Sequence, residues 1–416
     1  MSAAVDAEPS HEGTSTIEWL ELFFDLVVVA AVAVLTEGLR EDPSWEGLGL
    51  FALLYAGIWF SWTQVVLYAN VAGSATKTRT VVIGMFLVAV MAGTAPIHFQ
   101  ERANVFAVAF IVLRVVASRS SLLTGRVLQG WPLLQFGGAT TPWIVAMWVE
   151  TPWKYVLWAV GLALDLGLVL LRGNEIDDAR LAHMQERLDQ EGGRRSGGRG
   201  GGRVGAERRA AEPIQLSVVD VDHSHLQERL GLFVIIVLGE VVSALVLTAS
   251  TTEWSRPFVG VAIAAFVVLV ALWWLTFSYG FVGAPHTRIA LLEPRFGLPM
   301  HLLTTAGILM LAAGFGEMAV EPEHHLGTGL RWIMCAGLSL HVLVMTVSAA
   351  TGGIPKRWLF GWGMPCSLAP VALAIWGQHL GNQAVIWLLF LTLGWLVLYR
   401  PGRWGRARSK RRAATP

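Results

Sequence analysis

The chain has 416 residues, of which 54% are hydrophobic and only 15% charged, and its formal net charge is +1. Its mean hydropathy of +0.55 is too high for an ordinary soluble enzyme of this length, so the composition indicates a membrane protein. Both of its cysteines, Cys335 and Cys366, lie in apolar segments. This placement excludes a disulfide framework and a CxxC metal site.

Long apolar runs follow one another along the chain. Each has about 17 to 25 residues, the length that an α-helix needs to cross a bilayer. Six runs precede a polar central segment and six follow it, near residues 17–39, 47–70, 80–97, 103–119, 131–149, 153–171, 226–250, 257–282, 297–318, 328–350, 358–380 and 382–399. The sequence therefore predicts an all-α polytopic membrane bundle of about twelve transmembrane helices, in contact with the lipid bilayer.

The positive charges are distributed unevenly between the loops that these spans define. Of the 31 Lys and Arg residues, 25 fall on one side of the membrane, five fall on the other, and Arg114 lies within a span. Cytoplasmic loops of membrane proteins hold the excess of Lys and Arg. The asymmetry therefore predicts a multi-pass protein of the cell (plasma) membrane, the inner membrane of a bacterium, with both termini in the cytoplasm.

The polar and apolar segments divide the chain into five parts. They are a cytoplasmic tail (1–16), a first transmembrane half (17–172), a Gly- and Arg-rich, partly disordered linker (173–222), a second transmembrane half (223–400) and a basic cytoplasmic tail (401–416). The arginines of the linker and of the basic tail either are simply solvated or contact anionic lipids. No nucleic-acid partner is expected.

Three landmarks recur in the same order in both halves. Glu21 and Glu228 each precede an apolar run, Trp-rich segments begin at Trp59 and Trp273, and apolar segments with small residues follow. This order predicts a parallel tandem repeat of six helices, with a substrate or ion path between the two copies. Chance resemblance between apolar helices is the alternative.

Five ionisable residues fall deep within the predicted spans: Asp25, Arg114, Asp165, Glu240 and His341. With a rise of about 1.5 Å per residue, Asp25 lies roughly 10 Å below the cytoplasmic surface and the other four lie near the midplane. A charge at that depth is costly unless it is paired, so Arg114 needs an acidic partner and acts as an organising counter-charge. At least one carboxyl group is then left to bind a proton or an ion, and Glu240 is the preferred candidate. Two structural alternatives stay open: Arg114 forms an ion pair that only stabilises the fold, or Glu240 is protonated and hydrogen-bonded to a neighbour without any transport role.

The second half begins with acidic and histidine residues in the sequence DVDHSHLQER. Asp220, Asp222, His223 and His225 are types of residue that ligate transition metals, but a capped helix start is favoured, and no metal or cofactor is predicted. Further along, His301 and His341 either relay protons or are structural.

Three segments resemble the bacterial low temperature requirement A (LtrA) family: WLELFFDLVVVAAVA, FAVAFIVLR ending at Arg114, and HLQERLGLFVIIVLGE from His225 to Glu240. The resemblance covers most of the chain and implies an integral membrane protein connected by name to growth in the cold, without supplying a substrate. The segment VAGSATK after Asn70 departs from the family pattern, which puts any site in that loop in doubt. Carried over position by position, the pattern falls on Glu21, Asp25, Asn70, Arg114, His225, Glu228, Arg229, Glu240 and His301.

Three functions are compatible with these residues. The first is a proton-coupled transporter or channel that uses the intramembrane carboxyl groups of Asp25, Glu240 and Asp165 to move protons, small ions or solutes. The second is an intramembrane lipid-modifying enzyme, and the third is a non-catalytic membrane scaffold or sensor in cold growth; a non-enzymatic role is favoured. The enzyme would use the residues of a cytoplasmic-side motif, which are Glu18, Glu21, His225, Glu228 and His301, with Arg229 beside them in the family pattern.

Overall fold

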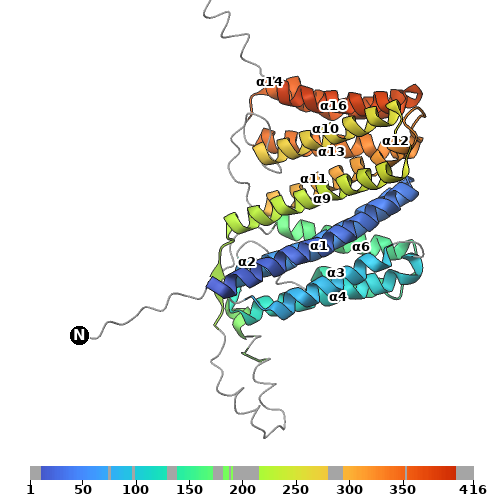
Figure 1. Cartoon of the computed structure of the whole chain (residues 1–416). Coiled ribbons are helices and arrows are strands. Elements are labelled where there is room, and N and C mark those ends of the chain that lie inside the picture. The colour runs from blue at the N-terminus through green and yellow to red at the C-terminus, as the bar shows by residue number, and fades with distance from the viewer. Residues whose placement is uncertain are drawn as a thin grey trace, which may run out of the picture. The chain divides into compact units, whose positions relative to one another are not determined.

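The structure, a computed structural model, describes residues 11–73, 76–95, 99–128, 138–171, 181–186, 189–190, 215–279, 294–351 and 354–399. Most of these residues are helical (Figure 1). The strands among them are β1 and β2, of three residues each, which pair in parallel with Arg126 opposite Ser217. The predicted all-α class is confirmed apart from this short ladder.

Long helices alternate with short connecting elements. A bilayer offers no water to backbone N–H and C=O groups, so an apolar run of span length satisfies them within a helix. In chain order the elements are α1 (His11–Glu41), α2 (Trp45–Ala72), α3 (Thr78–Thr94), α4 (Phe99–Leu123), β1 (Arg126–Leu128), η3 (Gly138–Thr140), α5 (Thr141–Ala146), α6 (Trp153–Leu171), β2 (Ser217–Val219), α9 (His223–Thr251), α10 (Arg256–Tyr279), α11 (Pro294–Ala312), α12 (Phe315–Val320), α13 (Thr328–Thr351), α14 (Lys356–Trp358), η4 (Leu359–Gly363), α15 (Met364–Trp376), η5 (Gly377–His379) and α16 (Asn382–Leu398).

Nine helical segments of the described chain are long and apolar enough to cross a membrane, as expected for a multi-pass membrane protein. Two further expected spans, near 80–97 and 382–399, correspond to the shorter apolar helices α3 and α16. The span expected near 131–149 contains only η3 and the six-residue α5 within the described residues, so the count of twelve stays a prediction. The nine segments are Trp19–Glu41, Trp45–Ala72, Phe99–Leu123, Trp153–Leu170, His223–Thr251, Arg256–Ser278, Arg295–Val320, Thr328–Thr351 and Lys356–His379.

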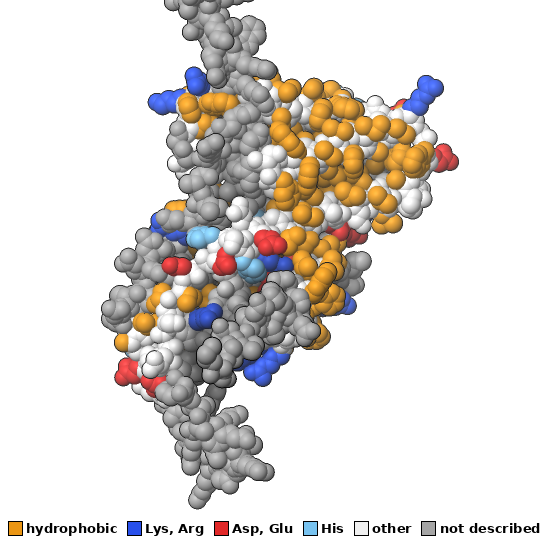
Figure 2. Space-filling model, turned by 60° about the vertical axis from the view of Figure 1, so that its left-hand side comes forward, with side chains coloured by type: hydrophobic (Ala, Val, Ile, Leu, Met, Phe, Trp, Pro, Cys, Tyr) orange, Lys and Arg blue, Asp and Glu red, His pale blue; other side chains and the backbone are white. Residues whose placement is uncertain are grey.

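Large apolar side chains cover the outside of the helices. Phe86 on α3, Leu247 on α9 and Phe266 on α10 each expose more than half of their surface. Figure 2 shows hydrophobic side chains spread over one face of the molecule. Soluble monomers rarely expose such large apolar areas, so these surfaces fit contact with lipid.

The chain divides into two compact units. Unit 1 comprises Met1–Val28, Gly57–Thr94 and Gln100–Gln227, and unit 2 comprises Val29–Ala56, Ala95–Phe99 and Glu228–Pro416. These units do not coincide with the two halves expected from the sequence, because unit 2 includes residues from the first half. The two halves and their tandem repeat therefore stay a prediction.

An aromatic stack forms part of the core of unit 1, between α4, α5 and α6. The ring centroids of Phe110 and Trp143 are 4.1 Å apart, and those of Trp143 and Trp158 are 4.7 Å apart. Gly161 makes room for these rings, because a Cβ atom there would lie 2.5 Å from Nε1 of Trp143. The stack ties α4 and α6 together and so positions the deep ionisable residues of both helices.

In unit 2, the backbones of α11 and α13 approach closely at two glycines. A Cβ atom on Gly337 would lie 2.6 Å from the carbonyl oxygen of Gly307 and 2.8 Å from the backbone nitrogen of Leu311. Small residues at helix interfaces permit this kind of contact in membrane bundles. The packing of unit 2 therefore depends on the absence of a side chain at these two positions.

Replacing Gly337 by alanine should lower the free energy of unfolding by about 1–3 kcal/mol, because the backbone atoms in its way cannot rotate aside. Gly93→Ala in α3 is the matched control, since a Cβ atom there has nothing within 4 Å. Thermal unfolding in detergent, followed by circular dichroism, should show a lower midpoint for Gly337→Ala only. Equal midpoints for the two variants would contradict the close approach of α11 and α13.

Candidate functional site

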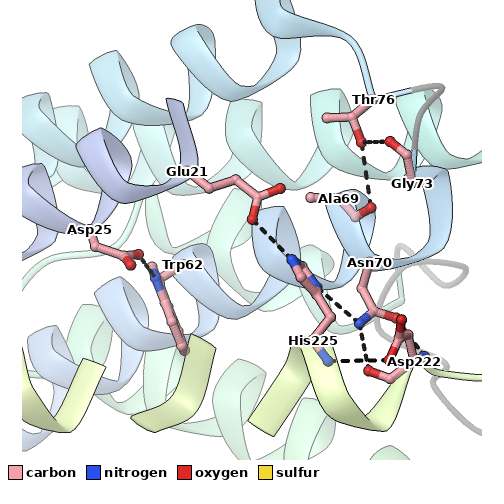
Figure 3. A network of polar contacts seen from close by, with 9 residues as sticks. All are labelled: Glu21, Asp25, Trp62, Ala69, Asn70, Gly73, Thr76, Asp222 and His225. Atoms are coloured by element: carbon pink, nitrogen blue, oxygen red, sulfur yellow. Dashed lines mark hydrogen bonds and ion pairs between the residues drawn. The ribbon is translucent and has the colours of Figure 1, made fainter. Parts of the chain in front are cut away.

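Four polar residues meet within unit 1, where α2 ends and α9 begins beside the first half of α1 (Figure 3). Glu21 lies on α1, Asn70 on α2, Asp222 just before α9, and His225 in the first turn of α9. His225 Nε2 is 3.2 Å from Oε2 of Glu21, and His225 Nδ1 is 3.2 Å from Nδ2 of Asn70. We call these four residues the His225 cluster.

Asn70 holds the start of α9 through two hydrogen bonds to the backbone of Asp222. The N–H of Asp222 donates to Oδ1 of Asn70 at 3.0 Å, and Nδ2 of Asn70 donates to the carbonyl oxygen of Asp222 at 2.9 Å. A backbone N–H can only donate, so the atom that it meets must be the amide oxygen. The orientation of the Asn70 amide is therefore fixed by chemistry, and its nitrogen faces His225.

This orientation also determines which nitrogen of His225 carries hydrogen. Nδ2 of Asn70 is a donor, so Nδ1 of His225 accepts, and a neutral ring carries its hydrogen on Nε2. That hydrogen points to Glu21, whose carboxylate accepts it. A second hydrogen on Nδ1 would face the N–H of Asn70, so protonating the ring requires this contact to break. The geometry thus couples the protonation of His225 to the position of Asn70.

The end of α2 is shaped so that Asn70 reaches the cluster. Gly73 has a φ of 52°, in the left-handed region that favours glycine. The hydroxyl of Thr76 donates to the carbonyl oxygens of Gly73 and Ala69, at 2.7 and 3.4 Å, and closes the turn after the helix. Helix α2 therefore ends at Ala72, two residues after Asn70, which leaves Asn70 beside the start of α9.

Asp222 caps α9. Its Oδ1 accepts hydrogen bonds from the hydroxyl and backbone N–H of Ser224 and from the backbone N–H of His225. The Ser224 hydroxyl, followed by the N–H of His225, lowers the pKa of Asp222. The ionised cap therefore contributes stability at neutral pH that is lost as the pH falls through this lowered pKa. This is the capped helix start favoured from the sequence; no three His, Cys, Asp or Glu side chains in the described residues form a metal-binding group.

Asp25 lies one helical turn beyond Glu21 on α1 and is 1% exposed. Its Oδ1 accepts a hydrogen bond of 2.8 Å from the indole Nε1 of Trp62 on α2 (Figure 3). Four residues along a helix correspond to about 6 Å of rise. Polar groups in unit 1 therefore continue from exposed Asp222, through His225 and Glu21, to a carboxyl group inside a membrane-spanning helix.

Arg114 and Asp165 form an ion pair in the interior of unit 1. Nη2 of Arg114 donates to Oδ1 of Asp165 at 2.8 Å, and Nη1 donates to Oδ2. Both residues are buried, and the guanidinium carbon lies 5.5 Å from the ring centroid of Phe110. Of the three acidic partners that the sequence allows for Arg114, the structure brings Asp165 to it. Asp25 meets Trp62 instead.

The remaining predicted site residues belong to unit 2. Glu228 is exposed, Arg229 is buried, and Glu240 is partly exposed on α9. His301 is fully buried in the middle of α11, where its Nε2 donates to the carbonyl oxygen of Leu230 at 3.1 Å. The structure thus joins Glu21, the predicted proton site Asp25 and His225 within one unit, and the roles proposed for the unit 2 residues stay predictions.

Two contacts of this region were not predicted from the sequence: the bond from Trp62 to Asp25, and the bonds between Asn70 and the backbone of Asp222. Trp62 belongs to a Trp-rich span, and such spans are typical of interfacial belts. For this reason the sequence does not distinguish Trp62, whose indole binds Asp25, from the other tryptophans. Asp222 bonds to Asn70 through its backbone N–H and carbonyl oxygen. Every residue other than proline has these two groups, so the type of residue does not predict such a contact. The family pattern that includes Asn70 is the signal that points to this end of α2.

Replacing Asn70 by alanine should release the start of α9, because both hydrogen bonds to the backbone of Asp222 are lost. We expect amide hydrogen exchange of residues 222–227 to become at least about tenfold faster, the effect of losing roughly 1.4 kcal/mol of local stability. Hydrogen exchange with mass spectrometry on the full chain measures this. Asn104→Ala is the control: it removes the bond that Asn104 donates to the carbonyl oxygen of Met147 and the bond that it accepts from Lys154, and it should leave the segment unchanged. Equal exchange in both variants would contradict the role of Asn70.

Comparison with known proteins gives a family match over nearly the whole chain. The model of the family described as "Bacterial low temperature requirement A protein (LtrA)" matches residues 16–398, which confirms the resemblance seen in three sequence segments. A similar protein, "Uncharacterized protein RA0937" of Rhizobium meliloti (strain 1021), is 26% identical over 329 residues, covering 74% of this chain and 70% of the relative. No solved structure matches.

Proposed function

The chain belongs to the bacterial low temperature requirement A family, and for this multi-pass membrane protein we propose a function as a transporter or channel that moves protons, or a small ion or solute together with protons. Asp25 is the proposed proton-binding residue. The proposal locates the protein in the plasma membrane with both termini in the cytoplasm, on the strength of the Lys and Arg asymmetry of its loops.

One observation carries the proposal: the line of polar groups from Asp222 to Asp25. A carboxyl group at membrane depth is costly, and such residues commonly mark ion or proton pathways. Glu21 and His225, in contact at 3.2 Å, both have side chains that can bind and release a proton, and Glu21 lies one helical turn from Asp25 on α1. In the proposed orientation the cluster is the cytoplasmic entrance, and a proton passes from His225 and Glu21 to Asp25.

Two further groups have supporting roles in this proposal. Arg114 is the organising counter-charge of unit 1, because its bidentate pair with Asp165 ties α4 to α6 at membrane depth. Glu240 is a second candidate for proton or ion binding, in unit 2, since it lies on the membrane-spanning part of α9 and is partly exposed. Asp165 remains a candidate as well, in a state where its bond to Arg114 is broken.

Reconstitution into liposomes that contain a pH-sensitive dye tests the proposal. An imposed pH gradient with a valinomycin-clamped potential should collapse at least about tenfold faster in liposomes with protein than in empty ones, a difference of about 1.4 kcal/mol in the barrier. The measurement should be repeated with inward and outward gradients. Equal rates with and without protein, in both directions, would overturn proton movement as the function.

The contact between Glu21 and His225 also favours a second candidate function, an intramembrane lipid-modifying enzyme. A carboxylate beside an imidazole is a common arrangement for general acid and base catalysis, and His225 is partly exposed at the end of a membrane span. The enzyme proposal predicts that a deletion strain has an altered lipid composition that the wild-type gene restores and a Glu21→Gln gene does not. Lipid mass spectrometry of the three strains would reject it by giving identical profiles.

A further inference from the structure

A polar side chain in the interior of unit 1 has no hydrogen-bond partner among the described residues. Gln64 on α2 is 0% exposed, and neither its Nε2 nor its Oε1 meets a donor or acceptor there. Buried amide groups are almost always hydrogen-bonded, to protein or to ordered water. Gln64 therefore points to a ligand that supplies both a donor and an acceptor.

The face of α2 that carries Gln64 is directed at α4 and α5. Gln64 lies seven residues after Gly57, almost two full turns, so the two residues share one face of the helix. A Cβ atom on Gly57 would lie 3.2 Å from the ring of Phe106 on α4 and 3.8 Å from Trp143 on α5. Gln64 thus faces the interior of unit 1.

Two contacts between α2 and the α4 segment show which residue of α4 lies at the level of Gln64. Gly57 is next to Phe106, and further along the chain the guanidinium of Arg126 donates to the carbonyl oxygen of Val71 at 3.2 Å. Later residues of α2 meet later residues of the α4 segment, so the two helices run in the same direction. Seven residues beyond Phe106 is position 113, so Gln64 lies at the level of Arg114 and its ion pair.

We propose that Gln64 binds internal water, and that this water forms a polar site at the level of the Arg114–Asp165 pair. The surrounding groups favour a neutral ligand, because the amide is uncharged and the ion pair has no net charge. Water supplies the donor and the acceptor that Gln64 needs, and buried waters typically make two to four such bonds. A free ion would find no compensating charge there.

This site is separate from Asp25. Trp62, the partner of Asp25, is two residues from Gln64, which corresponds to a rotation of about 200° on a helix. The two polar sites therefore lie on opposite faces of α2. The water site goes beyond the proposed proton path and does not depend on it.

Hydroxyl-radical footprinting tests the proposal, because X-rays generate radicals from bound water as well as from solvent. The full chain in lipid nanodiscs is irradiated, and oxidation is measured by mass spectrometry. Phe60 and Tyr68 lie four residues before and after Gln64 and are 3% and 0% exposed. They should be oxidised at least five times faster than Phe315, a residue of unit 2 that is 1% exposed. Exposed Trp148 calibrates the dose.

Gln64→Leu should reduce the oxidation of Phe60 and Tyr68 to the rate of Phe315. Ser61→Ala is the matched control one turn away, because its hydroxyl already donates to the carbonyl oxygen of Gly57 at 2.9 Å, and it should leave both rates unchanged.

Two results would overturn the inference: oxidation of Phe60 and Tyr68 in the wild type no faster than that of Phe315, or equal oxidation in the wild type and in Gln64→Leu. The wild-type measurement decides even where the variant does not fold. Neither result involves proton flux, so the water site and the proposed function can fail independently.

Discussion

Replacing Asp25 by asparagine should lower the proton flux of the reconstituted protein at least tenfold. Asparagine has nearly the same shape and can still accept the hydrogen bond of 2.8 Å from Trp62, but it cannot take up and release a proton. The fold should therefore survive while the proposed transfer from Glu21 stops. The pH dye in liposomes measures the flux, and size-exclusion chromatography in detergent checks the fold.

Glu101→Gln is the matched control for this experiment. Glu101 lies on α4 in unit 1, is exposed, and has no part in the proposed path. Its neutralisation should leave the flux unchanged. If Asp25→Asn retains the wild-type flux while the wild type itself conducts protons, the proton passes elsewhere, and Glu240→Gln becomes the next variant to measure.

Replacing Arg114 alone by methionine should lower the free energy of unfolding by about 3–5 kcal/mol, because it leaves Asp165 charged and buried without its partner. Replacing both residues, Arg114→Met with Asp165→Leu, should recover most of this loss, since apolar side chains of similar volume often substitute for a buried ion pair without cost. Chemical unfolding in mixed micelles compares the single and the double variant with the wild type. Equal losses in the single and the double variant would contradict the pairing.

The double variant also separates two of the functions considered for this protein. If the deep charges only assemble the bundle, as in a scaffold or sensor, the recovered double variant should support growth in the cold like the wild type. If Arg114 organises a transport path, the double variant should fold and yet conduct poorly. Growth at low temperature and proton flux, measured on the same variant, distinguish these outcomes.

The sequence predicts the class of fold well and the partners of single side chains less well. Apolar runs of span length leave the backbone few alternatives to a helix in a bilayer. The partner of Arg114 cannot be chosen by depth alone, because Asp25, Asp165 and Glu240 all satisfy that criterion. The choice depends on how α4 and α6 are rotated about their axes, and the aromatic stack around Trp143 determines that rotation.

For the candidate site too, the sequence predicts the residues better than the contacts between them. Sequence reasoning places Glu21 and His225 on one side of the membrane, but their contact at 3.2 Å depends on Asn70, which holds the backbone of Asp222. Backbone groups look alike at every position, so residue types cannot reveal a bond of this kind. His301, expected with the same motif, belongs to unit 2 and meets Leu230 there.

The bonds between Asn70 and Asp222 join positions 152 residues apart, which has a consequence for biosynthesis. A ribosome makes Asn70 long before it makes the first turn of α9, so a nascent chain that ends after α6 has no histidine ring for Glu21 to hold. The cluster can assemble only once a later membrane span has emerged and returned to α2. Chains released early would therefore insert into the bilayer without acquiring this site.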